Sequence, residues 1–416
     1  MTNIERIAEY IARGCTEVRR LGVEIEHFAV NDRMEQVPYS GGINDILEEL
    51  SKCYPKKEYS MGELIALCSD EASITIEPAG QIEISIKPCS DIAAIDRIYK
   101  RFEDRIAPIL SRRGLRLISL GYTPRSRAAN EELIPKLRYE FMDRYFRGTG
   151  SMGRNMMRAT ASTQVSIDFS DERDCVKKLR AANLLTPILS LMTDNSPFFE
   201  GKPYDGRMLR TTIWNNVDSA RCGTVPGLFD DSFGFLRYAE YIYNSPPILI
   251  MTENGAVYTG SAPASEIYKD KPLTEDETEH LLSMFFPDAR LKRYIEIRPA
   301  DSMPREYAMG YTALIKALFV NGAMPELPDA LGEKDISRAK AELTEKGFDG
   351  TIYEMKAYDL AEDILTKAEN ALSGEDKKYL APLAAAAREG LSVKEYAAKK
   401  GTYNGISAGI QKNGYR

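Results

Sequence analysis

The stretch Gly22-Val-Glu-Ile-Glu-His-Phe-Ala-Val30 carries two carboxylates on one face of an expected β-strand. Successive side chains of a strand point to opposite faces, so Glu24 and Glu26 lie about 7 Å apart on one face, opposite the apolar residues. Oxygen ligands at this spacing suit Mg²⁺, which is often held by a few carboxylates together with substrate phosphates. An antiparallel sheet with one face in water shows the same alternation. This stretch alone leaves both interpretations open, a metal site and a solvated sheet face.

A second segment, from Ile74 to Ile86, repeats the pattern on both sides of a Pro-Ala-Gly turn. Glu77 precedes the turn, and Gln81 and Glu83 follow it. The turn predicts a hairpin whose two strands present these polar side chains together. The joint occurrence of the two segments favours the metal site over a solvated face.

Two later segments have the same character. In Thr160–Phe169, Gln164 belongs to a polar set that alternates with apolar residues, and in Arg293–Arg298 the side chains of Glu296 and Arg298 share one face. Four segments with one polar and one aliphatic face predict an α+β fold built on a mostly antiparallel sheet. We expect the concave face of this sheet to be polar and its convex face to be covered by helices.

The length of 416 residues exceeds the roughly 250–300 residues at which a single core stops growing. From about Glu333 onward the composition shifts to Ala, Lys and Glu with helical periodicity. We therefore expect a main domain over residues 1–330 and a helical C-terminal region over residues 331–416 packed on it. The net charge of −7 argues against a general nucleic-acid-binding surface.

The chain shows no targeting or membrane signal. Its N-terminus has the pattern of a charged amphipathic helix rather than of a signal peptide, and its most hydrophobic stretch, residues 246–251, is too short to span a bilayer. The six cysteines are scattered without a C-x-x-C pair, which is typical of neither a zinc site nor a disulfide framework. These features predict a cytoplasmic protein that contacts no membrane.

Two common catalytic or nucleotide-binding arrangements are excluded. The chain has only two histidines, His27 and His280, which leaves little for a Ser-His-Asp mechanism, and we expect both to be structural. Residues Gly148–Gly153 match G-x-G-x-x-G by letter, but a helix precedes them and a strand follows, the reverse of a dinucleotide-binding turn. No P-loop sequence is present.

Carboxylates that are clustered on a buried face become protonated unless water or a metal ion compensates their charge. Four arginines could neutralise phosphate or carboxylate groups by bidentate contacts: Arg138, Arg210, Arg221 and Arg298. The single tryptophan, Trp214, either lines a pocket or packs in the core. The residues alone thus indicate metal-assisted phosphate chemistry on an open sheet.

The same segments, in the same order, resemble the plant-type branch of the glutamate–cysteine ligases, which also occurs in bacteria. The resemblance covers about residues 15–325. The blocks that carry it are Gly22-Val-Glu-Ile-Glu-His-Phe28, Glu77-Pro-Ala-Gly-Gln-Ile-Glu-Ile-Ser85, Ile134–Tyr139, Met156–Arg158, Thr163–Asp168, Asn195–Pro203, Ile213–Gly223 and Phe286–Asp301.

The resemblance implies a glutamine-synthetase-like fold, in which the antiparallel sheet curves into a funnel, with residues 1–330 as the catalytic ligase domain. It implies that ATP phosphorylates the γ-carboxylate of L-glutamate and that the amine of L-cysteine then displaces the phosphate. The product would be γ-glutamylcysteine, the first intermediate of glutathione-type thiol synthesis. The implied cofactor is Mg²⁺ (or Mn²⁺), with ATP as co-substrate.

The resemblance also implies roles for individual residues. The metal ligands would be Glu24, Glu26, Glu77 and Glu83. Contacts to the nucleotide would come from Glu24, Gln81 and Glu296. The catalytic side chains would be Glu296 and Arg298. Substrate binding would fall to Met157, Thr160, Gln164, Arg210, Trp214 and Arg221.

Three positions depart from the usual pattern of these ligases. A frequent Asn is Ser166, the Pro-Lys-Trp-Arg block reads Pro124-Arg-Ser-Arg127, and Arg-Gly-Ala-Asp reads Arg298-Pro-Ala-Asp301. They leave open a carboxylate–amine ligase of the same fold with a different acceptor amine. A non-catalytic protein that binds glutamate or nucleotide is a further alternative. We expect a monomer or a homodimer.

Overall fold

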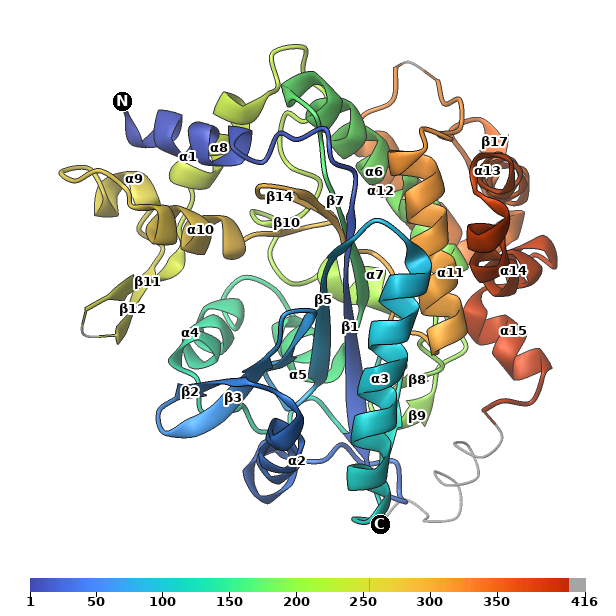
Figure 1. Cartoon of the computed structure of the whole chain (residues 1–416). Coiled ribbons are helices and arrows are strands. Elements are labelled where there is room, and N and C mark those ends of the chain that lie inside the picture. The colour runs from blue at the N-terminus through green and yellow to red at the C-terminus, as the bar shows by residue number, and fades with distance from the viewer. Residues whose placement is uncertain (254, 329, 404–416) are drawn as a thin grey trace.

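A nine-stranded sheet forms the centre of the molecule in the computed structural model (Figure 1). The structure describes residues 1–253, 255–328 and 330–403. The strands run in the order β14-β15-β7-β1-β5-β4-β3-β2, and β6 also pairs with β1. All neighbouring pairs of this sheet are antiparallel, which confirms the predicted α+β class. The strands are β1 (Leu21–Val30), β2 (Lys56–Ser60), β3 (Glu63–Cys68), β4 (Ala72–Ile76), β5 (Ile82–Cys89), β6 (Arg116–Ile118), β7 (Thr163–Ile167), β14 (Ala289–Leu291) and β15 (Ile295–Ile297).

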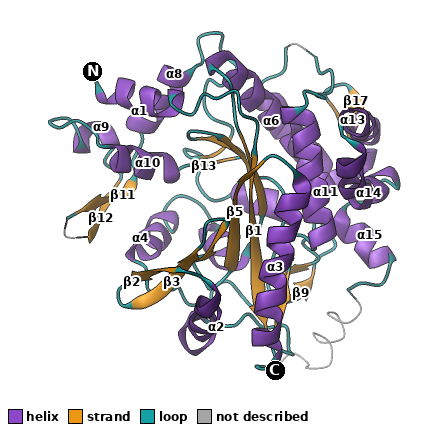
Figure 2. Cartoon of the chain, in the orientation of Figure 1, coloured by secondary structure: helices purple, strands orange, loops and turns teal. Residues whose placement is uncertain are grey.

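Three long helices cover one face of this sheet (Figure 2). Helix α3 (Ile92–Ser111) contacts β5 and β6, α6 (Glu172–Met192) contacts β14 and β15, and α11 (Arg305–Ile315) contacts β1 and β7. The other helices that precede residue 330 are α1 (Asn3–Ala12), α2 (Asn44–Leu50), α4 (Leu137–Phe146), α5 (Gly153–Ala159), α7 (Leu209–Trp214), α8 (Phe235–Tyr243), α9 (Ala264–Ile267) and α10 (Glu275–Ser283). The short strands outside the main sheet are β8 (Phe198–Phe199), β9 (Lys202–Pro203), β10 (Cys222–Gly223), β11 (Ile248–Thr252), β12 (Gly255–Gly260), β13 (Phe286–Pro287), β16 (Thr351–Ile352) and β17 (Met355–Lys356).

The alternation in β1 positions the site. Val23 and Ile25 are almost fully buried in the core, at 1% and 0% exposure, while Glu24 and Glu26 are half-buried on the opposite face. Burying an aliphatic side chain of this size stabilises a fold by about 1.5–3 kcal/mol. Because a shift of one residue would turn the carboxylates into the core, this burial fixes the register of β1.

In the described part of the chain, four α-helices and one short hairpin follow residue 330. The helices are α12 (Glu333–Lys346), α13 (Ala357–Ala371), α14 (Gly374–Arg388) and α15 (Val393–Lys399), with β16 and β17 between α12 and α13, and α14 packs on α11 while α12 packs on α6. The predicted boundary at residue 330 stays a prediction, and the part of the predicted region beyond residue 403 lies outside the described residues. Within residues 1–253, 255–328 and 330–403, no helix has the length and apolar character that crossing a membrane requires. The six cysteines are free.

Candidate active site

A cavity of about 730 Å³ opens on the polar face of the sheet. Strands β1, β5 and β7 supply its floor, and helices α4, α5 and α7 contribute its walls. The β2–β3 and β11–β12 hairpins, α10 and β14 add further lining residues. The predicted residues that line it are Glu24, Glu26, Glu77, Gln81, Glu83, Arg138, Met157, Thr160, Gln164, Arg210, Trp214 and Arg298. Of the predicted set, Glu296 and Arg221 do not line it.

Two of the cavity carboxylates are direct partners across neighbouring strands. Glu26 on β1 is paired in register with Glu83 on β5. An oxygen of Glu83 accepts hydrogen bonds from Thr75 Oγ1 at 2.9 Å and from Ser85 Oγ at 2.7 Å. The backbone N–H of Ser162 donates to Glu26 Oε2 at 2.7 Å. These donors hold both carboxylates at fixed positions on the cavity floor.

The cavity carboxylates have strongly perturbed proton affinities. Burial, followed by repulsion from neighbouring carboxylates, raises the pKa of Glu24 and of Glu26 to about 8 and that of Glu83 to about 7. Burial also raises the pKa of Glu77, an effect that Lys136 opposes. A site that favours protonation in this way also favours a cation, because either one removes the repulsion.

The donor set fits a hard divalent cation that is shared with a substrate. In the described part of the chain, no three His, Cys, Asp or Glu side chains are grouped closely enough to hold a metal ion by themselves. Mg²⁺ typically takes only one or two protein carboxylates and completes its octahedral shell with water and phosphate oxygens. The four carboxylates on the cavity floor offer oxygen ligands of this kind, with no sulfur or imidazole among them.

Glu296 lies beneath the cavity surface rather than on it, which differs from the predicted direct contact with a ligand. It is fully buried, and its Oε2 accepts hydrogen bonds from Arg290 Nε at 2.8 Å and Arg298 Nη1 at 2.7 Å. Burial opposes ionisation, but the two guanidinium groups outweigh it and hold the pKa of Glu296 well below its usual range. Its Oε1 has no hydrogen-bond partner among the described residues. This oxygen is therefore the one that could bind a cation, or accept a hydrogen bond after a rearrangement of the site.

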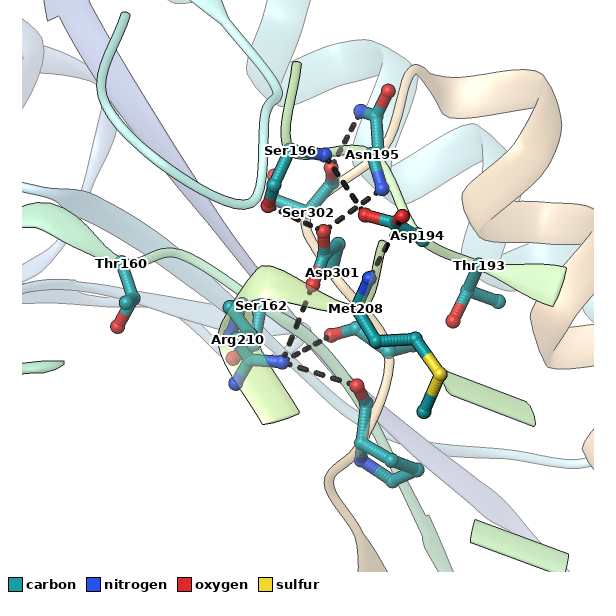
Figure 3. A network of polar contacts seen from close by, with 12 residues as sticks. Thr160, Ser162, Thr193, Asp194, Asn195, Ser196, Met208, Arg210, Asp301 and Ser302 are labelled. Atoms are coloured by element: carbon teal, nitrogen blue, oxygen red, sulfur yellow. Dashed lines mark hydrogen bonds and ion pairs between the residues drawn. The ribbon is translucent and has the colours of Figure 1, made fainter. Parts of the chain in front are cut away.

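Arg210 and Trp214 reach the cavity from the two ends of α7. Arg210 Nη1 donates to the carbonyl oxygens of Pro299 and Ala300, each at 3.1 Å, and lies 3.7 Å from a carboxylate oxygen of Asp301 (Figure 3). Arg210 Nε and Trp214 Nε1 are buried without a partner in the described part of the structure. Unpartnered buried donors beside a cavity are typical of a site that is completed by a ligand.

The two predicted glutamines have different roles. Gln81 Nε2 donates to the carbonyl oxygens of Met157 and Thr160, at 3.2 and 3.1 Å, so it fastens the cavity wall to the floor. Gln164 Nε2 donates to Glu26 Oε1 at 3.3 Å, while its own Oε1 accepts from Arg298. Gln164 therefore links the carboxylates to the arginine side of the site.

Arg221 corrects a prediction, because it lies in the core rather than in the cavity. It is 1% exposed and pairs with Asp218 at 2.7 Å, three residues earlier. Its remaining nitrogens donate to Tyr145 Oη and to the carbonyl oxygens of Pro246 and Met284. Each of its three nitrogens is engaged, so this guanidinium holds four segments together, and its burial in the core keeps it out of reach of a substrate in the cavity.

The predictions missed three cations of the cavity, Lys136, Arg290 and Lys292. Arg290 on β14 and Lys292 directly after it alternate with the buried Ala289 and Leu291, so the period-two pattern that marked the other strands was present there too. Lys136 precedes α4 in a loop, where no periodic signal exists.

Both histidines are held by hydrogen bonds. His27 is buried, and its Nε2 lies 2.7 Å from Tyr99 Oη. Burial lowers its pKa to about 4, so it stays neutral at physiological pH. His280 lines the cavity, but its Nε2 is bonded to the carbonyl oxygen of Leu249 at 2.8 Å.

Comparison with known proteins places the chain among ligases. The sequence model of glutamate-cysteine ligase family 2 (GCS2) matches residues 20–409. The chain is 30% identical over 388 residues to glutamate–cysteine ligase B, chloroplastic, of Oryza sativa subsp. japonica, covering 88% of this chain and 77% of the relative. It is 32% identical over 312 residues to glutamate–cysteine ligase, chloroplastic, of Nicotiana tabacum, covering 72% of this chain and 59% of the relative.

A solved structure supports the fold. The crystal structure of a glutamate–cysteine ligase from Francisella tularensis, in complex with AMP, superposes with a TM-score of 0.57 at 10% identity, covering 96% of this chain and 89% of the other. At this identity the match speaks for the fold alone, and the fold agrees with the expected sheet. With its family model matched over nearly the whole chain, the protein belongs to glutamate-cysteine ligase family 2.

Proposed function

We propose that this protein is an ATP-dependent glutamate–cysteine ligase that joins the γ-carboxylate of L-glutamate to the amine of L-cysteine. One observation carries the proposal beyond family membership. Seven of the eight family blocks contribute residues to one cavity, which contains carboxylates that favour a cation together with Arg210 and Trp214, each of which has an unpartnered buried donor. A ligase that activates a carboxylate with ATP needs both groups, the carboxylates to hold the metal ions that bind the phosphates and the donors to position the substrate.

The two ends of the carboxylate row have different neighbours. Burial raises the pKa of both carboxyls, but the charges that partly offset this rise differ: those of Lys292 and Arg290 at Glu24, and that of Arg210 at Glu26. We therefore assign the Glu24 end to the triphosphate of ATP and the Glu26 end to glutamate. Phosphate oxygens would meet Lys292 and Arg290, and a carboxylate of glutamate would meet the free donors of Arg210.

The proposed reaction has two steps. An oxygen of the glutamate γ-carboxylate attacks the γ-phosphorus of ATP, and ADP leaves as the γ-glutamyl phosphate forms. The amine nitrogen of cysteine then attacks the acyl carbon, the bond from that carbon to the phosphate oxygen breaks, and the nitrogen loses a proton. The products are γ-glutamylcysteine, ADP and inorganic phosphate.

The chain supplies positioning and charge neutralisation for these steps. Mg²⁺ or Mn²⁺, each ion held by one or two of Glu24, Glu26, Glu77 and Glu83 together with phosphate oxygens, would neutralise phosphate charge when bound. Arg298 is fixed by Glu296 and Gln164, and it faces the cavity where negative charge develops on the transferred group. Met157, Thr160, Gln164 and Trp214 would enclose the amino acid substrates.

An assay of phosphate release with ATP, glutamate and a panel of amines tests the proposal. We expect the largest kcat/KM with cysteine. The alternative acceptor is supported by Ser166, which lies opposite Glu296 in the β7–β15 register where related ligases frequently carry Asn. A larger kcat/KM with another amine would establish that alternative. Glutamate or nucleotide binding without any turnover would instead identify a non-catalytic binding protein.

The binding partners, the oligomeric state and the cellular location are also part of the proposal. We infer small-molecule partners only, without nucleic acid, and a monomer or homodimer. The names of the two plant relatives place those proteins in the chloroplast, whereas we propose a cytoplasmic location for this chain.

A further inference from the structure

The segment that leads into α7 is held by a residue of the C-terminal helix α15. Lys394 Nζ donates to the carbonyl oxygen of Gly206 at 2.5 Å and pairs with Asp194 Oδ2 at 3.1 Å. The same Asp194 oxygen accepts the backbone N–H of Met208 at 2.9 Å. The backbone N–H of Lys394 also donates to the carbonyl oxygen of Asp194 at 2.8 Å. Lys394 thus clamps the short segment of residues 206–208 at both ends, Gly206 directly and Met208 through Asp194.

The clamp is buried and acts on a strained position. Asp194 and Lys394 are 1% and 6% exposed, so each depends on the other for compensation of its charge. Met208 adopts a left-handed conformation with φ of 52°, which non-glycine residues rarely occupy. Such a conformation persists only where the surroundings enforce it, and the bond from Met208 to Asp194 does so here.

The clamped segment determines where Arg210 lies. Arg210 is the second residue of α7, two positions after Met208. A second route runs through Asp301, whose Oδ2 accepts the hydroxyl of Ser196 at 2.6 Å and whose Oδ1 faces Arg210 (Figure 3). Ser196 in turn donates its backbone N–H to Asp194 at 3.3 Å. Two connected paths therefore lead from α15 to the cavity arginine.

We propose that Lys394 is a positioning residue, through which the C-terminal helix sets the orientation of Arg210 and so the affinity for the carboxylate of the donor amino acid. The inference rests on the proposed function for the identity of that amino acid. Lys394 lies outside the residues that line the cavity, so its effect reaches the substrate only through α7 and Asp301.

The Lys394→Met variant of the full chain tests this inference. We expect the KM for glutamate to rise about tenfold or more while kcat and the KM for ATP stay within about threefold, because only the arginine end of the cavity is displaced. Trp214 is the only tryptophan of the chain and lies on α7, so its fluorescence reports the same displacement without turnover. Acrylamide should quench Trp214 more readily in the variant, and glutamate should protect it less.

Two further variants make the test specific. Lys394→Arg keeps the charge and should restore most of the affinity for glutamate. Lys399 lies on the same helix as Lys394 and makes an exposed pair with Glu389, at the end of α14, so Lys399→Met should change neither KM nor quenching. If Lys394→Met does not fold, Glu395→Gln tests the same segment, because Glu395 pairs with Arg207 at 3.0 Å. We expect a smaller rise in the KM for glutamate in that variant.

The inference is overturned if the glutamate KM and Trp214 quenching are unchanged in a folded Lys394→Met protein. Equal rises in the KM for glutamate and for ATP also overturn it, since they would mean that the variant disturbs the whole cavity rather than its arginine end. Failure of the proposed function has a separate signature, which is absence of phosphate release by the unmodified protein. In that event acrylamide quenching of Trp214 still decides whether Lys394 positions α7.

Discussion

Glu26 and Glu83 face each other directly across the antiparallel strands β1 and β5. Like charges at directly opposed positions destabilise a sheet, so this pairing costs stability in the ligand-free protein. Each carboxylate is nevertheless held in place by hydrogen-bond donors. The pair is therefore arranged to bind a cation, and the stability that it costs the ligand-free protein should be measurable.

The first prediction concerns pH. Glu24, Glu26 and Glu83 have a raised pKa of about 7 to 8, so between pH 4.5 and 8 the folded protein binds protons that the unfolded chain has lost. Their contribution to the free energy of unfolding is present below pH 4.5 and is lost as pH rises through 7 to 8. In EDTA, we expect the Tm to fall by on the order of 5 °C between pH 6 and pH 8.

Mg²⁺ supplies the matching test. It competes with protons for the same oxygens, so it should raise the Tm more at pH 8 than at pH 6. The Glu26→Gln variant, which removes one of the interacting charges, should show a shallower pH dependence in EDTA. An equal Mg²⁺ effect at both pH values would show that these carboxylates do not bind the ion.

The second prediction separates function from stability at Glu83. In Glu83→Gln, the amide oxygen still accepts from Thr75 and Ser85, while the negative charge opposite Glu26 is lost. Turnover should fall by about 10²-fold or more, because a charged ligand is removed from the site. The Tm in EDTA at pH 8 should be equal or higher. Glu63→Gln, at the exposed first residue of β3, is the control and should change neither quantity.

Much of this site could be predicted from sequence because successive side chains of a β-strand point alternately to its two faces. Glu24, Glu26 and Gln164 lie on the cavity face because their apolar neighbours must lie in the core. The same rule places Glu296 on the polar face. It cannot tell that Arg290, from the adjacent strand β14, would cover that carboxylate, since this depends on strand order.

Contacts between distant segments are the part that local patterns do not contain. The sequence around Arg221 and around Arg210 is similarly polar. Arg221 nevertheless donates hydrogen bonds to carbonyl oxygens in the core, whereas Arg210 lines the cavity. The pairing of Asp194 with Lys394 joins the loop that follows α6 to the C-terminal helix α15. Only the packing of α15 against the turn before α7 brings these two charges together.

The third prediction concerns Arg298, whose Nη1 bonds both Gln164 and Glu296 and whose guanidinium lies 5.8 Å from the Trp214 ring centroid. A lysine keeps the charge but cannot reproduce this planar arrangement. We expect Arg298→Lys to lower kcat by about 10²-fold, comparable to the loss of one transition-state donor. Arg293→Lys, on an exposed side chain nearby in sequence, is the control for initial-rate phosphate release. Wild-type kcat in Arg298→Lys would remove Arg298 from the proposed catalytic set.

The last prediction tests the correction at Arg221. Because this guanidinium is buried with Asp218, Arg221→Met leaves an uncompensated carboxylate and should destabilise the fold by about 3–5 kcal/mol. Protein that remains folded at low temperature should keep the glutamate KM of the parent within about twofold, because no donor is lost from the cavity. The double variant Asp218→Leu, Arg221→Met should unfold at lower urea than the parent but at higher urea than Arg221→Met, since it removes the orphaned charge as well. A large rise in the glutamate KM without loss of stability would return Arg221 to the substrate site.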